Sequence, residues 1–190
     1  MNKMNFFDMI LSKMRYSKVK KYIKKEFVVA DIGCYKDAWF LRSVSKEIKK
    51  GYGFDLKAEN KKEDNIEIIS INLEGKNTLK YKEEFDLVIA LALLEHLSEP
   101  EQFLKNISFC LKKGGIIVLT TPSPRAKPLL EFLAYKLHLI SEDSIREHKT
   151  YFSKQHLINT LSKTGFSIIE FKKFQFGLNQ FVAAKKNGKA

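Results

Sequence analysis

The chain is poor in cysteine and lacks long apolar runs, and both features limit what it can be. It has two cysteines, Cys34 and Cys110, which lie too far apart to form a Cys-x-x-Cys pair. We therefore expect a reduced, cytoplasmic protein without a zinc site. No run reaches the roughly 18 to 20 apolar residues that a membrane span needs. The start of the chain has a lysine within its apolar part and no small-residue cleavage site, so we expect no signal peptide.

Internal repeats, low-complexity tracts and linkers are also absent from the sequence. At 190 residues, we expect one domain over 1–190. The net charge of +12, from 34 basic and 22 acidic residues, could favour binding of nucleic acid, anionic lipid or a phosphorylated substrate. Because the lysines are scattered rather than interleaved with aromatic residues, we interpret them as a solvated basic surface.

Residues 1–26 predict a helical segment that precedes the first strand. Phe6, Ile10 and Met14 recur at four-residue spacing, and lysines occupy the other face. We favour packing of this segment over the end of a core sheet. A helix lying on a membrane surface would show a similar pattern, so peripheral membrane contact stays an alternative.

Strand-like and helix-like stretches alternate along the rest of the chain. Helices are expected over 39–48 and from Ser98, as the N-terminal cap, to Gly114 and Gly115, which stop the helix. The stretches typical of strands are 28–30, 51–55, 66–71, 85–97 and 116–121. This alternation predicts an α/β fold with a doubly wound, mostly parallel sheet.

The corner after the first strand carries a weak ligand-binding signal. Asp31 ends the strand and Gly33 follows, as in the nucleotide-binding corner of doubly wound domains. With one glycine, however, the Gly-x-Gly-x-x-Gly fingerprint is absent. Asp55 stands at the tip of the second strand, where a carboxylate can accept both hydroxyls of a ribose. An ordinary surface aspartate at a strand end would look the same.

Several short motifs follow one another in a recognisable order. They are Asp31-Ile-Gly-Cys34, Asp55, Asn72-Leu-Glu74, Phe85-Asp86, Leu94-Glu95-His96-Leu97, Leu111-Lys-Lys-Gly-Gly115, His148-Lys-Thr-Tyr-Phe-Ser153 and Gly165-Phe166. In this order they resemble the class I S-adenosylmethionine-dependent methyltransferases. The ending Gly177-Leu-Asn-Gln180 before the final strand is similar to that of small single-domain members associated with glycan biosynthesis. The resemblance implies a Rossmann-like, seven-stranded, mostly parallel sheet with helices on both faces. Its last strand is antiparallel and forms a closing hairpin from 167–171 and 179–185.

The resemblance also implies a binding site for S-adenosylmethionine. Carried over residue by residue, that site consists of Asp31, Gly33, Cys34, Asp55, Asn72, Leu73 and Leu91. The first three would surround the methionine end, Asp55 would hold the ribose, the next two would meet the adenine, and Leu91 would border the sulfonium.

Two departures from the family pattern bear on cofactor binding. Where the family usually has Gly-x-Gly-x-Gly, this chain has Gly33-Cys-Tyr-Lys-Asp. Because Tyr35 and Asp37 do not visit positive φ freely, we expect the loop to take another path. We hypothesise that Lys36 or the backbone around it compensates by meeting the carboxylate of the cofactor. Asn72 stands where aspartate is common, and its carbonyl can still accept from the adenine amino group.

Methyl transfer from a sulfonium requires neither a metal nor a covalent nucleophile, and we predict no metal site. For a hydroxyl acceptor the protein must align the reactants, exclude water and remove a proton. His148 is the candidate base, expected near its pKa at working pH. A histidine that only packs or caps is an equally good interpretation. From at least one of Glu95 and His96 we expect structural hydrogen bonding.

Residues 122–153 form the least standard part of the chain, an insertion on the acceptor side. Residues 129–140 are apolar nearly all round, which predicts a helix buried on more than one side. This helix could form a lid over the acceptor, pair with a second subunit in a homodimer, or touch a membrane; we favour the lid.

We expect a methyltransferase that acts on a small-molecule or glycan acceptor, with oxygen as the favoured acceptor atom. A nucleic-acid methyltransferase is one alternative, favoured by charge. It is disfavoured because Leu94-Glu95-His96 lacks the Asn-Pro-Pro-aromatic tetrad used for exocyclic base amines. A second alternative is a non-catalytic partner protein that keeps the fold and has lost cofactor binding through its altered glycine loop.

Overall fold

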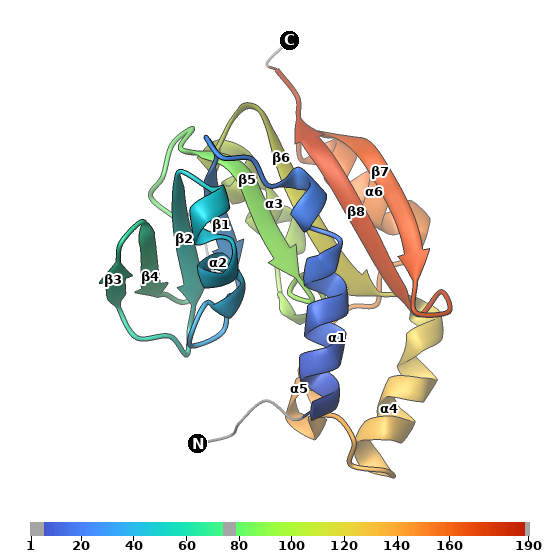
Figure 1. The fold of residues 1–190 in the computed structure, drawn as a ribbon. Helices are drawn as coiled ribbons and strands as arrows, with labels where there is room; N and C mark the ends of the chain where they lie inside the picture. The colour runs from blue at the N-terminus through green and yellow to red at the C-terminus, as the bar shows by residue number, and fades with distance from the viewer. Residues whose placement is uncertain (1–5, 74–78, 189–190) are drawn as a thin grey trace.

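The structure, a computed structural model, describes residues 6–73 and 79–188. Glu74 of the Asn72-Leu-Glu74 motif and residues 1–5 of the expected N-terminal helix lie outside the described residues. Within them, eight strands form one sheet in the order β3-β4-β2-β1-β5-β6-β8-β7 (Figure 1). In chain order these are β1 (Val28–Ile32), β2 (Lys50–Asp55), β3 (Lys61–Glu63), β4 (Ile66–Ser70), β5 (Phe85–Leu91), β6 (Leu111–Pro122), β7 (Phe166–Phe174) and β8 (Asn179–Lys186).

The sheet confirms the predicted doubly wound architecture and adds one strand. Strands β4, β2, β1, β5 and β6 pair in parallel, whereas β8 runs antiparallel to both β6 and β7. The closing hairpin and the antiparallel last strand are therefore as expected. The additional strand is β3, which pairs antiparallel with β4 at the edge of the sheet. Its three residues, Lys61 to Glu63, are all charged, a composition that protects an exposed edge but gives no strand-like apolar alternation.

Helices cover both faces of the sheet. They are α1 (Phe6–Ser17), α2 (Trp39–Ser43), α3 (Pro100–Cys110), α4 (Lys127–Tyr135), α5 (Glu142–Arg146) and α6 (Lys154–Lys163). One buried cluster joins Val28 and Ala30 of β1 to α3 and α6, and a second joins Val29 to α1 and α2. Successive residues of a strand point to opposite faces, so the apolar run of β1 supplies both cores.

The helix before Gly114 and Gly115 is shorter than predicted. Helix α3 ends at Cys110, and β6 begins at once with Leu111, which pairs with Phe85. The two glycines instead lie where the pairing of β5 with β6 shifts register, and Gly114 has a φ of +73° there. They form an irregularity within the strand pair rather than a helix stop. Similarly, the predicted helix over 39–48 is the short α2 followed by a 3-10 turn, η2 (Ser45–Glu47).

The expected serine cap of α3 is also wrong. Glu99 occupies the capping position and makes no side-chain cap hydrogen bond, while Pro100 stands at the start of the helix as expected. The hydroxyl of Ser98 instead accepts a hydrogen bond from Lys149 Nζ at 2.7 Å. This contact connects the segment after β5 to the segment before α6.

The insertion is helical but more exposed than predicted. Helix α4 covers part of the expected apolar stretch, and of its side chains only that of Ala134 is buried. With Ile140 and Ile145 it forms a small separate cluster. Leu129 and Phe132, in contrast, are 40% and 52% exposed. The prediction of burial on more than one side is therefore wrong for the described chain.

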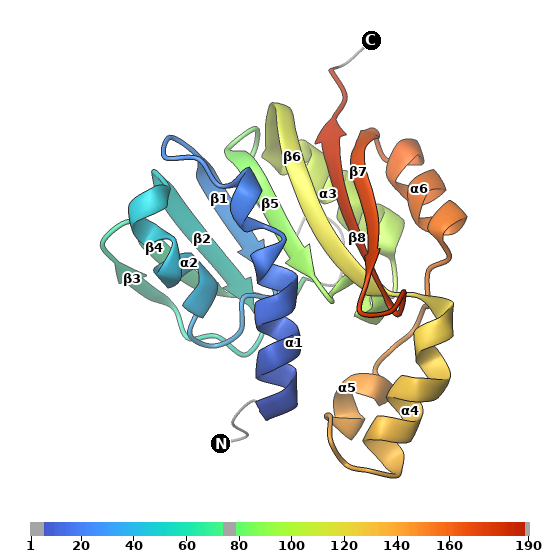
Figure 2. The same ribbon diagram turned by 45° about the vertical axis from the view of Figure 1, so that its right-hand side comes forward.

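Strands β1, β2, β4 and β5 end at the same edge of the sheet, and α1, α4 and α5 lie at this edge (Figure 2). Ligands of open α/β sheets bind outside the carboxyl ends of the strands, near the point where the strand order reverses. Here that point lies between β1 and β5. Within the described residues, none of the helices is both long and apolar enough to cross a membrane.

Candidate functional site

The corner after β1 is a loop that folds back over β2. Gly33 has a φ of +80°, and its N–H donates to the carbonyl oxygen of Phe54 at 2.7 Å. Cys34 is buried and lies directly over Gly53, where an added Cβ would come within 2.8 Å of its sulfur. The absence of a side chain at Gly53 is thus what lets the corner approach the sheet.

Tyr35 adopts the conformation that the sequence analysis considered unfavourable. Its φ is +65°, and Ala38 also lies in the left-handed region at +43°, whereas Asp37 does not. The expectation that Tyr35 would avoid positive φ is wrong. The physical reason is a tertiary contact, because the N–H of Tyr35 donates to Asp55 Oδ2 at 3.0 Å. The loop therefore reaches positive φ at Tyr35 and Ala38, two positions without glycine.

Asp55 stands at the end of β2, where it was predicted, and its carboxylate also accepts hydrogen bonds from backbone N–H groups. Its Oδ1 accepts from the N–H of Lys57 at 2.8 Å, and its Oδ2 accepts from Tyr35. A carboxylate oxygen has two lone pairs, so each oxygen can still accept one further hydrogen bond. The half-buried carboxylate is therefore suited to a pair of hydroxyls.

Asp31 is fully buried and is joined to the N-terminal helix. The Tyr16 hydroxyl donates to its Oδ2 at 2.9 Å, while Oδ1 is buried and makes no hydrogen bond within the described residues. Burial raises the pKa of Asp31 to about 7, against a lowering effect of the Tyr16 hydrogen bond, and the charge of Asp55 raises it further. The sequence analysis did not identify Tyr16, since nothing in an amphipathic helix marks the residue that will face a carboxylate 15 positions away.

The remaining predicted cofactor residues lie along the same edge. Asn72 is exposed shortly after β4, and the half-buried Leu73 packs against the core. Leu91 ends β5 and is half-buried as well. Lys36 is exposed in the corner loop. The structure thus brings all the predicted positions to the ends of β1, β2, β4 and β5, while their roles stay predictions.

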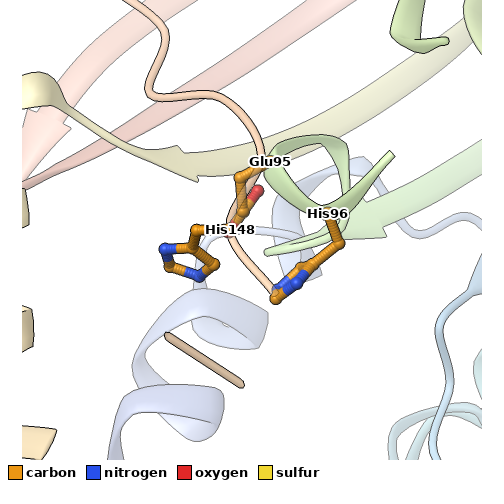
Figure 3. Close-up of side chains that lie close together, drawn as sticks. All are labelled: Glu95, His96 and His148. Carbon is orange, nitrogen blue, oxygen red and sulfur yellow. The ribbon is translucent and has the colours of Figure 1, made fainter. Parts of the chain in front are cut away.

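A second group of polar residues lies next to this corner, after β5. Glu95 and His96 belong to the turn η3 (Leu94–His96), and His148 follows α5 (Figure 3). The backbone carbonyl of Glu95 accepts hydrogen bonds from the N–H groups of Lys149 and Thr150, at 2.8 and 3.2 Å. These bonds fix the two segments against each other. The rings of His96 and His148 meet edge to face with centroids 4.7 Å apart.

Burial determines the protonation of this second group. The pKa of His148 is lowered to about 4, mainly by burial and then by the positive charges of His96 and Arg15. The imidazole is therefore neutral at pH 7, and the expectation of a pKa near working pH is wrong. Burial likewise lowers the pKa of His96 and raises that of Glu95 to about 7. Arg15 belongs to α1, so this helix adjoins both groups of residues.

The association of these three side chains was not predicted. Structural hydrogen bonding was expected from at least one of Glu95 and His96, and His148 was considered alone, because 52 residues separate His96 from His148. The motif Leu94-Glu95-His96-Leu97 was the available signal. What the sequence could not supply was the pairing of η3 with the segment after α5.

Comparisons with known proteins agree with this geometry. A model of the methyltransferase domain family matches residues 12–170. A tRNA U34 carboxymethyltransferase of Desulfotalea psychrophila is 26% identical over 170 residues, which cover 82% of this chain and 50% of that protein. A ubiquinone/menaquinone biosynthesis C-methyltransferase UbiE of Campylobacter jejuni is 23% identical over 192 residues, covering 87% of this chain and 81% of that protein.

Solved structures show the same fold. An S-adenosylmethionine-dependent methyltransferase from Mesorhizobium loti superposes with a TM-score of 0.68 and 15% identity, covering 90% of this chain and 96% of that one. At this identity the similarity shows the fold alone. The chain also spans only about half the length of the tRNA U34 carboxymethyltransferase reported above.

Proposed function

Because the chain belongs to the methyltransferase domain family, we propose that it transfers a methyl group from S-adenosylmethionine to an oxygen atom of a small-molecule or glycan-type acceptor. The single observation that carries this proposal is the proximity of two groups of residues at one edge of the sheet. The group around Asp31 and Asp55 suits a nucleoside with a charged tail, and the group around His148 contains a neutral imidazole. Methyl transfer to a hydroxyl oxygen needs a site for the cofactor and a base for the acceptor.

The residues around the corner after β1 fit the cofactor. Asp55 retains two acceptor positions for ribose hydroxyls, and the unpartnered Oδ1 of Asp31 leaves an acceptor near the methionine end. Leu73 and Leu91 offer half-buried apolar surface to a base and a sulfonium. When bound, S-adenosylmethionine supplies an activated methyl carbon. The chain's own task is then to bind, orient and exclude water.

The acceptor-side chemistry is assigned to His148. Its imidazole is neutral above a pH of about 4, so it can accept a proton from a hydroxyl at neutral pH. Tyr151 lies 2.9 Å from its Nδ1 and fixes the orientation of the ring. A base with so low a pKa is weak, so positioning of the acceptor contributes more than basicity does.

Helices α4 and α5 form the proposed acceptor lid. They lie at the same edge of the sheet as the corner loop, and His148 follows α5 directly in the chain. The exposed apolar side chains of α4 and the cations Arg125 and Arg146 near the ends of the insertion would suit an acceptor with an apolar body and an anionic group.

A nucleic-acid acceptor is the second candidate. Two observations favour it, the net charge of +12 and the similarity to tRNA U34 carboxymethyltransferases. A carbon acceptor has support from the similarity to UbiE. The non-catalytic alternative is weakened by the corner loop, which reaches positive φ at Tyr35 and Ala38 without glycine.

One experiment separates these candidates. Purified protein is titrated calorimetrically with S-adenosylmethionine and then assayed for methyl transfer to nucleotide sugars, quinone precursors and unmodified tRNA. We expect cofactor binding and transfer to oxygen of a sugar-type acceptor. Transfer only to tRNA or to a quinone carbon would replace the proposed acceptor, and a failure to bind the cofactor would support the non-catalytic alternative.

A further inference from the structure

Three metal-ligand side chains converge next to the cofactor corner, although the sequence analysis predicted no metal site. One carboxylate oxygen of Glu95 and one ring nitrogen each of His96 and His148 all lie within 4.8 Å of one another. Figure 3 shows the three side chains gathered where η3 meets the segment after α5. Two imidazoles and one carboxylate are a recurrent donor set for divalent transition ions.

The convergence is built by the backbone rather than by chance rotamers. The N–H groups of Lys149 and Thr150 both donate to the carbonyl oxygen of Glu95. They follow His148 immediately in the chain, so His148 is held beside Glu95 and His96 whatever its side chain does. Because the backbone already holds the two ligand-bearing segments together, the chain does not have to rearrange to bring the ligands near one another.

Two donor atoms of the cluster are buried without a hydrogen bond. They are Oε2 of Glu95 and Nδ1 of His96, and neither has a partner within the described residues. Glu95 itself is only 1% exposed. A buried carboxylate oxygen without a partner costs stability unless another group satisfies it. A cation coordinated by these two atoms would satisfy both.

The surroundings of His148 match those of a metal ligand. Its Nδ1 lies 2.9 Å from the Tyr151 hydroxyl, which leaves Nε2 as the nitrogen available for coordination. Ligating histidines usually engage their second ring nitrogen in such a hydrogen bond, which fixes the tautomer and the ring orientation.

We propose that Glu95, His96 and His148 form a binding site for one divalent transition ion, of the Zn²⁺ or Mn²⁺ type, next to the cofactor corner. Ligand atoms around such an ion are typically about 3 to 3.5 Å apart for metal–ligand bonds of about 2.1 Å. The observed separations of up to 4.8 Å therefore close by small rotations of the side chains. Three protein ligands leave at least one coordination position open.

The open position gives the site a role that rests on the proposed function. Leu93, two residues before Glu95, is the nearest neighbour of a Cβ built on Gly33, at 3.6 Å, so the cofactor corner and the metal site adjoin. A hydroxyl bound to the ion would have a lowered pKa and would release its proton to solvent, so in the ion-bound protein His148 would act as a ligand and not as the base. The ion would thus position and activate the oxygen of the acceptor.

Arg15 is the cation whose charge acts on all three side chains, Glu95, His96 and His148. The charge of Lys149 acts on His96 in the same direction, and that of Glu147 acts on it in the opposite one. The positive charge of Arg15 should weaken cation binding, so we expect an Arg15→Gln variant to bind the ion more tightly. If Arg15 were instead the counter-ion that Glu95 requires, that variant would lose stability and gain no affinity.

The test is calorimetric titration of tag-free, metal-depleted protein with Zn²⁺ and Mn²⁺, without cofactor or acceptor. We expect one ion per chain and at least an approximately 10-fold weaker affinity in His148→Gln and Glu95→Gln. His156→Gln, at an exposed histidine outside the cluster, is the matched control and should bind as wild type does. The visible bands of bound Co²⁺ should change in His148→Gln and not in the control.

A third variant keeps the test decisive if a ligand substitution prevents folding. Tyr151→Phe removes only the hydroxyl next to His148 Nδ1 and should weaken ion binding by about 10-fold. No binding of either ion, or binding that is the same in wild type, His148→Gln and Tyr151→Phe, would overturn the site. Because no methyl acceptor is present, this outcome is independent of whether the proposed function holds.

Discussion

The buried carboxylate of Asp31 receives its hydrogen bond from Tyr16, and this bond links α1 to the cofactor corner. The folded-state pKa of Asp31 is raised from 3.8 to about 7, so the folded chain holds the proton more tightly than the unfolded chain does. The stability contributed by this group is fully present below a pH of about 4 and is lost as the pH rises through about 7.

Removal of the Tyr16 hydroxyl should therefore destabilise the protein more at high pH than at low pH. In Tyr16→Phe the ring still stacks on Phe40, but the ionised carboxylate of Asp31 loses its donor. We expect a loss of about 1.5–3 kcal/mol at pH 8 and about 1 kcal/mol at pH 5, measured by denaturant unfolding. Tyr135→Phe, at an exposed tyrosine, is the control. Equal losses at both pH values would contradict this role for Asp31.

Asp55 should prove to be a binding residue as well as a structural one. We expect Asp55→Ala to weaken S-adenosylmethionine by roughly 1.5–3 kcal/mol, since ribose hydroxyls would lose a charged acceptor. Because the carboxylate also holds Tyr35 and Lys57, a smaller loss of stability should accompany it. Asp37→Asn, an exposed acid of the same loop, should leave affinity within about 0.5 kcal/mol. Unchanged calorimetric affinity in folded Asp55→Ala would remove it from the site.

At the scale of elements, the corner loop and β2 meet at one glycine. A Cβ at Gly53 would lie 2.8 Å from the sulfur of Cys34 and 3.2 Å from the Cβ of Ala38. We expect Gly53→Ala to cost about 1–3 kcal/mol through overpacking and to weaken cofactor binding. Adding Cys34→Ala should recover part of the loss, because it removes the closest atom. Gly188→Ala, with nothing within 4 Å, is the control, and additive losses in the double variant would refute the contact.

Helix α4 presents apolar side chains that the described chain leaves exposed. As an acceptor lid, α4 should tolerate Phe132→Ser without loss of stability, while the KM for the acceptor rises several-fold and cofactor affinity stays unchanged. Ile169→Ser, at an equally exposed position on β7, should alter neither. Light scattering completes the test. A dimer that dissociates in Phe132→Ser would instead identify α4 as a subunit interface.

At the scale of the whole molecule, two cores share one sheet, and this predicts a single folding unit. β1 contributes alternate residues to both clusters, so neither core can form without it. Trp39, the chain's one tryptophan, packs against Tyr16 with ring centroids 4.9 Å apart. Its fluorescence should report one transition that coincides with far-ultraviolet circular dichroism. Two separate transitions would contradict a single domain over 1–190.

Saturation with cofactor should move that transition as a whole. Ligand at 100 times its Kd stabilises a folded state by about 2.7 kcal/mol, so both probes should shift together to higher denaturant concentration. In Asp55→Ala the shift should be smaller at the same ligand concentration. A shift of the fluorescence transition alone would show that the corner loop unfolds independently of the sheet.

The sequence by itself determined the order and class of the main elements. Apolar runs such as 85–97 are typical of a central parallel strand buried on both faces, and within that run the structure has β5 over Phe85–Leu91. Asp31, Gly33 and Asp55 were placed correctly because strand ends are fixed by the same pattern. The edge strand β3 was missed, since its charged residues pair through backbone groups that no side-chain pattern reveals.

Only the tertiary structure decided what the polar residues face. The positive φ of Tyr35 depends on Asp55 from another strand, and the environment of Asp31 depends on Tyr16 from α1. The cluster of Glu95, His96 and His148 exists because two backbone hydrogen bonds join segments about 50 residues apart. Burial, which shifts the pKa values of Asp31, Glu95, His96 and His148, is a property of the packed chain. Local spacing in a sequence does not show which polar groups will be buried together.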